Sequence, residues 1–361
     1  MPTGVFLPTK KPLLWILFLG LQLLFINFAR QHPQWIEEVY SQGIYPIVFQ
    51  FQSRFFSLIP FSMGDLFYSI GLLALFYYLY TKFKYRPRIR GWWFSDALIF
   101  ISLAHFFFYF SWGLHYYRIP LHQKLNYKLS YTETQLTQTL TYYLEQTNRL
   151  HEELSEADSL PVLAPHSKEE LLHLIENNYQ LPLTKNHEWT PHAKNSLWSL
   201  PLSFAGYAGY LNPFTLESQI NKRQPPLSFV TTAAHEMAHQ WGIAAEDEAN
   251  FISFYSLSKH PNPYLRYAAH AFALRYLYYD LYRVDPELAK NYRQQMRKGV
   301  LQNFQILAHF WAQYENPIEP YLKQFYHQFL KVNGQQKGLK SYNAVVAYMV
   351  AHYQENKQNL K

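Results

Sequence analysis

The sequence contains no cysteine, and only 13 of its 361 residues are glycine. Without cysteine there are neither disulfides nor thiolate metal ligands, so a transition-metal site must use histidine and carboxylate side chains. The low glycine content and the lack of any repeat exclude fibrous and disordered classes. Apolar residues are abundant instead: hydrophobic residues make up 49% of the chain and aromatic residues 19%. Such a chain can bury a sizeable core.

Acidic charge is scarce relative to basic charge, and the formal net charge is +7. A basic protein invites a nucleic-acid interpretation, but five of the positive charges fall in one short run between two apolar segments, at Lys82, Lys84, Arg86, Arg88 and Arg90. A basic run in this position is typical of a loop that sets the orientation of a membrane protein. We therefore expect a lipid bilayer, and no nucleic acid, among the partners.

Three apolar stretches dominate the first third of the chain, at about residues 13–29, 62–81 and 92–117. Each is close to the roughly 17–25 residues that cross a bilayer, and the second needs its polar start or some tilt to do so. Trp112, Tyr116 and Tyr117 stand near the end of the third stretch, as interfacial aromatic residues do. We predict three transmembrane helices that form a membrane domain of residues 1–118.

The distribution of basic residues predicts the orientation of these helices. Lys10 and Lys11 precede the first stretch, and the basic run joins the second to the third. The amino terminus and the basic loop should therefore be cytoplasmic, and three crossings place residues 119–361 outside the cytoplasm. We interpret the first stretch as a retained span, because no clear cleavage site follows it and two more apolar stretches come after it. The sequence thus predicts a multi-pass cell-membrane protein.

Residues 119–361 predict a largely helical domain with a small strand or hairpin, so the fold class is mainly α, of the α+β kind. Thr132–Leu154 is an amphipathic helix candidate, and Ser167 and Glu170 form a capping box before a second helix. Small and β-favouring residues alternate with the turn-forming Gly206, Gly209 and Pro213, which predicts a strand or hairpin within Ser199–Ile220. Leu227–Trp241 returns to helix, and further helices should follow as far as Tyr353, with breaks near Pro261, Pro263, Pro286, Pro317 and Gly334.

The segment from Thr232 contains the pattern H-E-x-x-H, formed by His235, Glu236 and His239. Residues i and i+4 share one face of a helix, so the two imidazoles can reach the same metal ion. Zinc lowers the pKa of a bound water to about 7, and Glu236 could accept the proton of that water and later donate it to a leaving nitrogen. The alternative is an ordinary helix with two histidines, but small apolar neighbours and the following Gly242 favour a buried metal helix.

A catalytic zinc site usually has three protein ligands and one open position, so a third ligand is needed. The candidates are Glu246, Asp247 and Glu248. Glu246 and Asn250 are four residues apart and share a helix face, so we predict Glu246 as the ligand and Asn250 as a group that orients a histidine. Glu248 stays open as the second candidate. The three acidic residues could also be a solvated helix start that the helix dipole stabilises.

Four other residues near the motif invite a role in the chemistry. Tyr207 and Tyr210 precede the motif helix on a predicted edge strand, where a tyrosine could stabilise an oxyanion. His270 and Arg275 lie on a later helix and could polarise a substrate. Packing is the preferred interpretation for the tyrosines, because the chain has 31 of them, and core or surface roles are preferred for His270 and Arg275.

Several further strings recur in one family. They include G-I-Y-P at 43–46, P-F-S-M-G-D at 60–65, W-G-L-H-Y-Y-R at 112–118, G-Y-L-N-P-F-T at 209–215 and G-L-K-S-Y at 338–342, together with the H-E-M-A-H-Q-W-G and E-D-E-A-N-F strings around the motif. With them the chain resembles, over nearly its whole length, the bacterial membrane proteins of the domain of unknown function 3810 family. The resemblance implies three spans and a zincin-like domain, without a substrate.

A weaker likeness connects the motif region to the glutamate zincins, in which a glutamate of a following E-x-x-x-D helix binds zinc. Here Glu246 to Asn250 matches that pattern with Asn in place of Asp. A metzincin assignment fails, because the third histidine of that class would fall on Ala245.

These observations predict a membrane-anchored zinc metallopeptidase that cleaves a protein or peptide outside the cytoplasm, with Zn²⁺ as cofactor. Two alternatives remain: a zinc amidohydrolase acting on cell-wall peptide, and a non-catalytic membrane scaffold with a structural zinc. An intramembrane protease is disfavoured, because Glu246, Asp247 and Glu248 lie so close to a short apolar motif helix.

Overall fold

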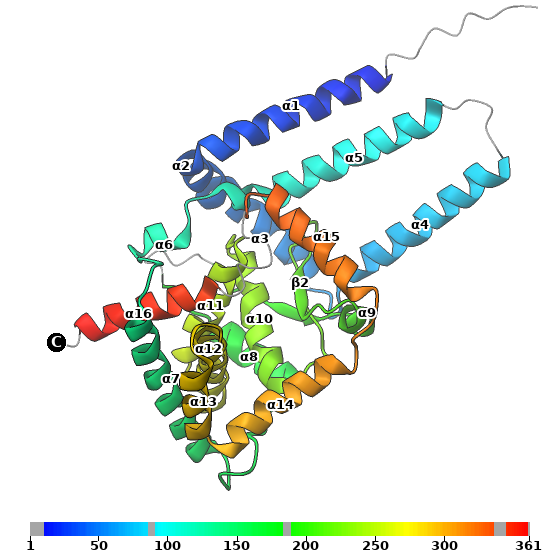
Figure 1. Cartoon of the computed structure of the whole chain (residues 1–361). Helices are drawn as coiled ribbons and strands as arrows, with labels where there is room; N and C mark the ends of the chain where they lie inside the picture. Colours follow the sequence, from blue (N-terminus) through cyan, green and yellow to red (C-terminus); the bar gives the residue numbers. More distant parts are fainter. Residues whose placement is uncertain (1–10, 86–90, 183–188, 336–343, 360–361) are drawn as a thin grey trace, which may run out of the picture.

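A computed structural model describes residues 11–85, 91–182, 189–335 and 344–359 of the chain (Figure 1). Lys10, Arg86, Arg88, Arg90 and the string at 338–342, which the sequence analysis used, lie outside the described residues. The structure is mainly helical, with one small sheet, as the composition and patterning predict.

Three helices are long and apolar enough to cross a membrane: α1 (Lys11–Gln31), α4 (Met63–Tyr85) and α5 (Gly91–Ser111). Helices α1 and α5 run side by side, whereas α4 stands apart from them at a similar tilt (Figure 1). His105 of α5 bonds to Gln22 of α1, with 2.7 Å between its Nδ1 and the amide oxygen. This histidine therefore has a structural partner between two spans.

Helix α5 ends at Ser111, before residue 117, where the predicted third stretch ends. Residues Gly113–Tyr117 form a short 3₁₀ helix, η2. Trp112 has an extended φ of −154°, which breaks the α-helix, and its indole Nε1 donates to the carbonyl of His239 at 2.9 Å. Trp112 and Tyr117 are buried within the protein rather than exposed at an interface. The apolar sequence continues beyond Ser111 because the residues that follow are buried in a protein core.

The segment between the first two spans forms structure that the sequence analysis did not predict: α2 (Pro33–Trp35), the π-helix η1 (Ile36–Ile44) and α3 (Tyr45–Phe56). Its buried side chains form one cluster with η2 and with the part of the chain around the motif helix, comprising Ile36, Tyr40, Tyr45, Phe49, Trp112, Leu114, Tyr117, Leu216 and Ala244. The hydroxyl of Tyr45 donates to the carbonyl of Gln240 at 2.8 Å. This segment therefore packs on the carboxyl-terminal part of the chain.

An ion cluster reinforces that contact. The Glu37 carboxylate accepts from Arg118 at 2.8 and 2.9 Å and lies 2.5 Å from the Lys124 ammonium. Burial alone would raise the pKa of Glu37, but hydrogen bonds and charge from Arg118 and Lys124 hold it well below its usual value. Arg118 also donates to the carbonyls of Trp241 and Gly242, at the end of the motif helix, where a cation is favourable.

The carboxyl-terminal part contains eleven helices among the residues described. They are α6 (Leu121–Lys124), α7 (Glu133–Leu154), α8 (Lys168–Asn177), α9 (Ser199–Phe204), α10 (Pro226–Gln240), α11 (Glu246–Ser258), α12 (Pro263–Val284), α13 (Pro286–Gln295), α14 (Lys298–Ala312), α15 (Glu319–Val332) and α16 (Val345–Asn359). The predicted capping box of Ser167 and Glu170 at α8 is confirmed, and Thr132, the first residue of the predicted amphipathic helix, is the N-cap of α7.

The sheet has three short strands in the order β1-β3-β2: β1 (Ala193–Asn195), β3 (Ser218–Ile220) and β2 (Gly209–Leu211). β1 is parallel to β3, and β2 is antiparallel to it with Tyr210 opposite Gln219. The predicted hairpin is confirmed, but its first residues, Ser199–Phe204, form α9 instead. Pro201 stands in the first turn of that helix, where proline is tolerated.

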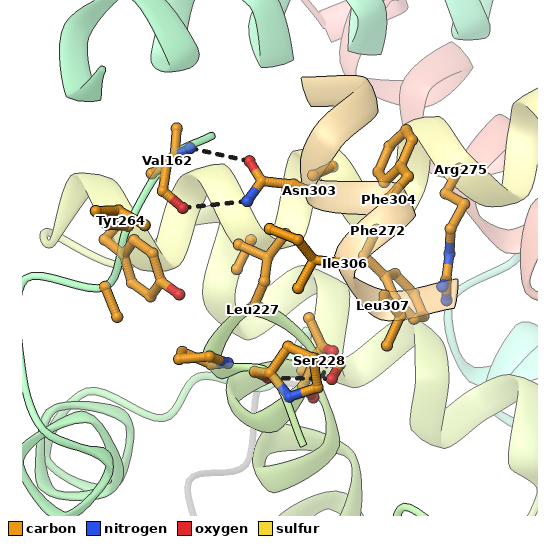
Figure 2. A pocket seen from close by; sticks show the side chains of 17 residues that line it. Val162, Leu227, Ser228, Tyr264, Phe272, Arg275, Asn303, Phe304, Ile306 and Leu307 are labelled. Carbon is orange, nitrogen blue, oxygen red and sulfur yellow. Dashed lines mark hydrogen bonds between the residues drawn. The ribbon is translucent and has the colours of Figure 1, made fainter. Parts of the chain in front are cut away.

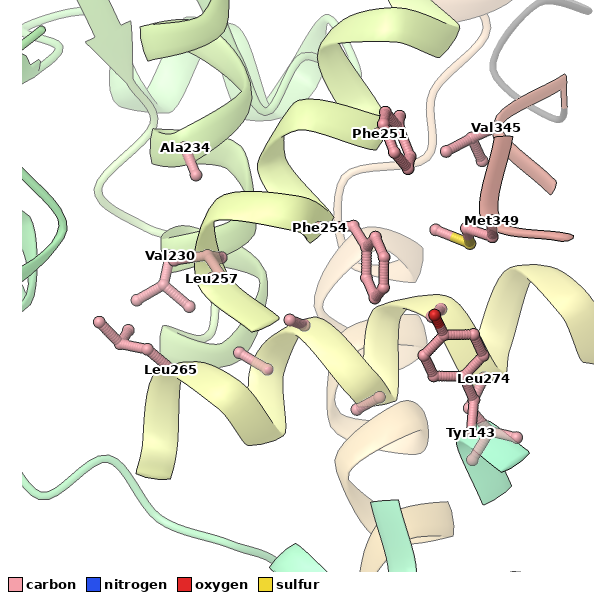
Figure 3. Close-up of a cluster of buried hydrophobic side chains, with 14 of the residues drawn as sticks. Tyr143, Val230, Ala234, Phe251, Phe254, Leu257, Leu265, Leu274, Val345 and Met349 are labelled. Carbon is pink, nitrogen blue, oxygen red and sulfur yellow. The ribbon is translucent and has the colours of Figure 1, made fainter. Parts of the chain in front are cut away.

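The main core lies where α10, α11 and α12 pack together with α7 and α16. Alanines on α10, such as Ala234, let the neighbouring helices approach closely, while larger residues fill the space between them. Figure 3 shows Phe251 and Phe254 of α11 between Val230 of α10 and Met349 of α16. The motif helix is thus held rigidly by its neighbours.

Gly242 ends the motif helix with a positive φ of 71°, and a Cβ at this position would overlap the imidazole ring of His115. Gly242→Ala should therefore destabilise the protein by about 2 kcal/mol or more, from backbone strain together with the clash. Thermal unfolding in detergent, followed by tryptophan fluorescence, measures the loss. Gly20→Ala is the matched control, because nothing lies within 4 Å of its new methyl group. Equal unfolding temperatures for the two variants would refute this account of the turn.

Candidate metal centre

Two consecutive helices bring the candidate ligands together. Helix α10 carries His235 and His239 one turn apart, with ring centroids separated by 4.8 Å. The turn at Gly242 reverses the chain, and α11 then begins at Glu246. The side chain of Glu246 therefore faces the two imidazoles from the start of the second helix.

The three side chains form a compact, buried cluster. The Glu246 Oε2 atom lies 3.1 Å from Nε2 of His235 and 3.9 Å from Nε2 of His239. One ligand atom from each residue lies within 4.8 Å of the others, so the cluster could hold a metal ion. All three residues are less than a tenth exposed. The sequence-predicted ligands His235, His239 and Glu246 thus meet at one point.

Each candidate ligand also makes a hydrogen bond through its second polar atom. His235 Nδ1 donates to the amide oxygen of Asn250 at 3.0 Å, and His239 Nδ1 donates to the carbonyl of Ile243 at 2.6 Å. The hydroxyl of Tyr326 donates to Glu246 Oε1 at 2.7 Å. With the protons on Nδ1, both Nε2 lone pairs point into the cluster, as metal-ligating histidines require. Asn250 takes the orienting position predicted for it.

Burial and charge set the protonation of the cluster. Burial lowers the pKa of His239 to about 4, with the His235 charge acting in the same direction. Burial by itself would raise the pKa of Glu246, but the adjacent imidazoles of His235 and His239 and the hydroxyl of Tyr326 bring it to about 2. A carboxylate and a neutral imidazole are the ligand forms of these groups.

Glu236 lies beside the cluster and is also buried. Burial raises its pKa to about 8. Its Oε2 atom has no hydrogen-bond partner among the described residues. Gly209 of β2 lies against it, because a Cβ at Gly209 would be 2.9 Å from the Glu236 Cγ. The Ser218 hydroxyl of β3 donates to the Glu236 carbonyl at 2.8 Å. The hairpin therefore covers this part of α10.

Glu248, the second candidate for the third ligand, lies elsewhere. Its carboxylate accepts from the backbone amide of Leu121 at 2.7 Å and from the hydroxyl of Tyr348 at 3.2 Å. Burial, with the neighbouring charge of Asp247, raises its pKa to about 7. The side chain joins α6 and α16 to α11 and takes no part in the cluster. Its position leaves Glu246 as the carboxylate beside the histidines.

Two cavities meet at the cluster. A polar cavity of about 410 Å³ contacts His235 and Glu236, and it is lined by Gln224, Thr232, Arg275 and Lys323 among others. A second cavity of about 360 Å³ contacts all three candidate ligands and Glu236 and is mostly aromatic. A smaller, apolar cavity of about 200 Å³ adjoins the polar one at Phe272 and Arg275 but contacts none of the candidate ligands (Figure 2).

The other residues singled out in the sequence take different places. Tyr207 lines both cavities at the cluster. The Tyr210 hydroxyl donates to buried Asp65 of α4, which favours the packing interpretation. His270 is buried against Tyr143 and Phe254 in the main core, outside the cluster. Arg275 lines the polar cavity.

The sequence analysis missed the residues that support the cluster from a distance in the chain. Tyr326 is one, and Trp112, which bonds to the carbonyl of His239 and packs edge-on against its ring at 5.8 Å, is another. Glu217, also missed, does not reach the cluster but accepts from the first amides of α4, at Met63 and Gly64. The only sequence signal was that Trp112, Met63 and Gly64 belong to strings shared with one family.

Comparison with known proteins gives one finding. No curated protein and no solved structure matches the chain. The model of one family, described as protein of unknown function (DUF3810), matches residues 40–350, which is most of the chain. The matched region includes α4, α5, the candidate ligands and Tyr326. The chain therefore belongs to the DUF3810 family, as its shared strings predict.

Proposed function

We propose that the protein is a membrane-anchored, zinc-dependent metallopeptidase. One observation carries the proposal: His235, His239 and Glu246 converge in a buried cluster with the Glu236 carboxylate beside it, where two cavities meet. Two imidazole nitrogens and one carboxylate oxygen are a donor set of catalytic zinc sites, which leave a position open. A structural zinc needs four protein ligands, whereas the cluster among the described residues has three.

The unsatisfied atoms of the cluster fit a bound cation. Glu246 Oε2 and Glu236 Oε2 are buried without a hydrogen-bond partner in the described part of the chain. A buried polar atom without a partner costs free energy, and a metal ion with its water would satisfy both oxygens. We infer that His235, His239 and Glu246 would hold the ion.

The remaining residues define what the chain itself contributes. When bound, zinc would activate water and polarise a carbonyl group. Glu236 takes the proton of the attacking water and passes it to the leaving nitrogen. The edge strand β2 lines the aromatic cavity with Gly209, Tyr210 and Leu211. Its free edge can pair with an extended peptide backbone and so align the cleaved bond.

We further propose that this site lies outside the cytoplasm. The basic run between the second and third apolar stretches supports this orientation. The packing of α3 on the carboxyl-terminal part fits three crossings, which put the segment after the first span and the chain after the third span on one side of the membrane; the basic run alone supports the choice of that side.

Removal of the metal tests the proposal directly. Purified full-length protein should hydrolyse a mixed-sequence peptide pool, and a chelator should abolish this activity because the open metal position disappears. Stoichiometric Zn²⁺ should then restore it. Fluorescence dequenching of the peptides measures the rate. Activity that survives complete removal of the metal, or a metal-loaded protein that cleaves no peptide of the pool, would contradict the proposal.

A further inference from the structure

The aromatic cavity at the cluster is built partly from the membrane spans. Tyr68 of α4 and Phe108 of α5 line it together with His235, Glu236 and His239. Tyr68 stands in the second turn of α4, and Phe108 lies one turn before the end of α5. These are the span ends that adjoin the carboxyl-terminal part, so the cavity lies at the level of the membrane surface. Its mouth borders two different spans.

The two spans leave an opening between them. Helix α5 pairs with α1, whereas the most apolar stretch of α4 has no residue buried within the chain. At their ends far from the cavity the two helices are joined, because Tyr78 and Lys82 of α4 bond to Asp96 of α5 at 2.6 and 3.1 Å. Any opening therefore lies nearer the cavity, where Tyr68 and Phe108 both line its wall. An apolar chain in the bilayer can therefore approach Tyr68 and Phe108 from the side.

Helix α15 forms another wall of this cavity. Tyr326 bonds to Glu246, and the ring of Phe329 packs edge-on against that of Phe108 with centroids 5.9 Å apart. Phe329 belongs to a row of large apolar residues that share one helix face, and the other members, all more than a third exposed, are Ile318 just before the helix, Tyr321, Leu322, Phe325 and Val332. Such a row is typical of a helix that lies on a bilayer surface.

The carboxyl-terminal end of α15 is hydrogen-bonded to α1 and α5. Arg30, at the end of α1, donates to the carbonyl of Val332 at 2.7 Å. Tyr109 of α5 donates to the side chain of Asn333 at 2.7 Å. The exposed apolar row thus continues the apolar surface of the spans towards the mouth of the cavity. The polar cavity, which meets the aromatic one at His235 and Glu236, has a larger share of polar groups, with Gln224, Thr232 and Arg275 in its wall.

We propose that the substrate is a peptide that carries an apolar, membrane-embedded anchor next to the cleaved bond. The anchor, an acyl chain or a transmembrane segment, enters between α4 and α5. Its flanking residues occupy the aromatic cavity, and the polar remainder of the peptide leaves through the polar cavity. This inference rests on the proposed function, and it assigns the substrate class of the same site.

The test uses full-length, zinc-loaded protein in nanodiscs of phosphatidylethanolamine and phosphatidylglycerol. The probes are one mixed-sequence, quenched fluorescent peptide pool in three forms: palmitoylated, fused to a leucine-rich transmembrane segment, and free. Phe108→Gln and Phe329→Gln should each lower the ratio of anchored to free cleavage by about tenfold, because apolar contact with the anchor is lost from a half-buried aromatic wall. Tyr279→Gln removes an exposed ring that lines neither cavity and should keep the wild-type ratio. The disc concentrates the anchored peptides equally for all variants, so this effect cannot change the ratio from one variant to another.

A second measurement does not depend on catalysis. The Glu236→Gln protein, with photoreactive benzoylphenylalanine in place of Phe329, should crosslink the anchored peptides at least about tenfold more than the free peptide. The same group in place of Tyr279 should show no such preference. If the ratios stay unchanged in both pocket variants, or the free peptide crosslinks equally, the substrate class is wrong while the metallopeptidase proposal stands. If the wild-type protein cleaves no form of the pool but the crosslinking preference holds, the metallopeptidase proposal fails alone.

Discussion

Replacing Glu236 with glutamine should lower peptide hydrolysis by about 10³-fold while the protein keeps its metal, because general acid–base groups contribute roughly 10²–10⁴-fold. The amide of glutamine has nearly the shape of the carboxylate but cannot take up the proton of the attacking water. His235, His239 and Glu246 are untouched, so the affinity for zinc should change little. The initial rate on the peptide pool, measured at equal zinc occupancy, checks the prediction.

Glu248→Gln is the matched control for this variant. Glu248 is also a buried glutamate near the cluster, but its carboxylate bonds to Leu121 and Tyr348 and not to the candidate ligands. Its replacement should change the unfolding temperature more than the rate of hydrolysis. A Glu236→Gln protein that hydrolyses peptides at the wild-type rate would refute the role of Glu236.

Replacing Glu246 with alanine should weaken zinc binding by at least about 100-fold, because removal even of a group that only orients a metal ligand costs 10–100-fold. Glu246 is the carboxylate closest to both histidines, at 3.1 Å from one Nε2 and 3.9 Å from the other. Glu248→Ala should leave zinc affinity within about threefold of wild type, since Glu248 lies outside the cluster. Competition with a chromophoric chelator measures both affinities. Equal losses in the two variants would contradict the assignment of Glu246.

Much of the metal centre could be predicted from the sequence, because its parts obey local rules. The spacing of His235 and His239 fixes their shared helix face, and the spacing of Glu246 and Asn250 does the same on the next helix. The turn between the helices was visible in Gly242. The structure brings these residues together as the local pattern implies. The chemistry assigned to them stays a prediction.

The parts that could not be predicted depend on contacts between distant segments. Tyr326 bonds to Glu246 across 80 residues of sequence, and no periodicity marks one tyrosine among 31. The end of α5 was not predicted, because the apolar residues after Ser111 enter a protein core, and hydropathy does not distinguish a core from a bilayer. The helices between the first two spans were not predicted, because their apolar residues pair with distant parts of the chain. η1 and α3 bury these residues against η2 and the residues around α10.

The measurement that tests the central claim most directly is the zinc content of the purified protein, determined by elemental analysis for the wild type, Glu246→Ala and Glu248→Ala after identical dialysis. If His235, His239 and Glu246 form a zinc site, the wild type and Glu248→Ala should each retain about one zinc ion per chain, and Glu246→Ala should retain little. A wild-type protein that holds no zinc after incubation with it, or a Glu246→Ala protein that holds as much as the wild type, would contradict the account.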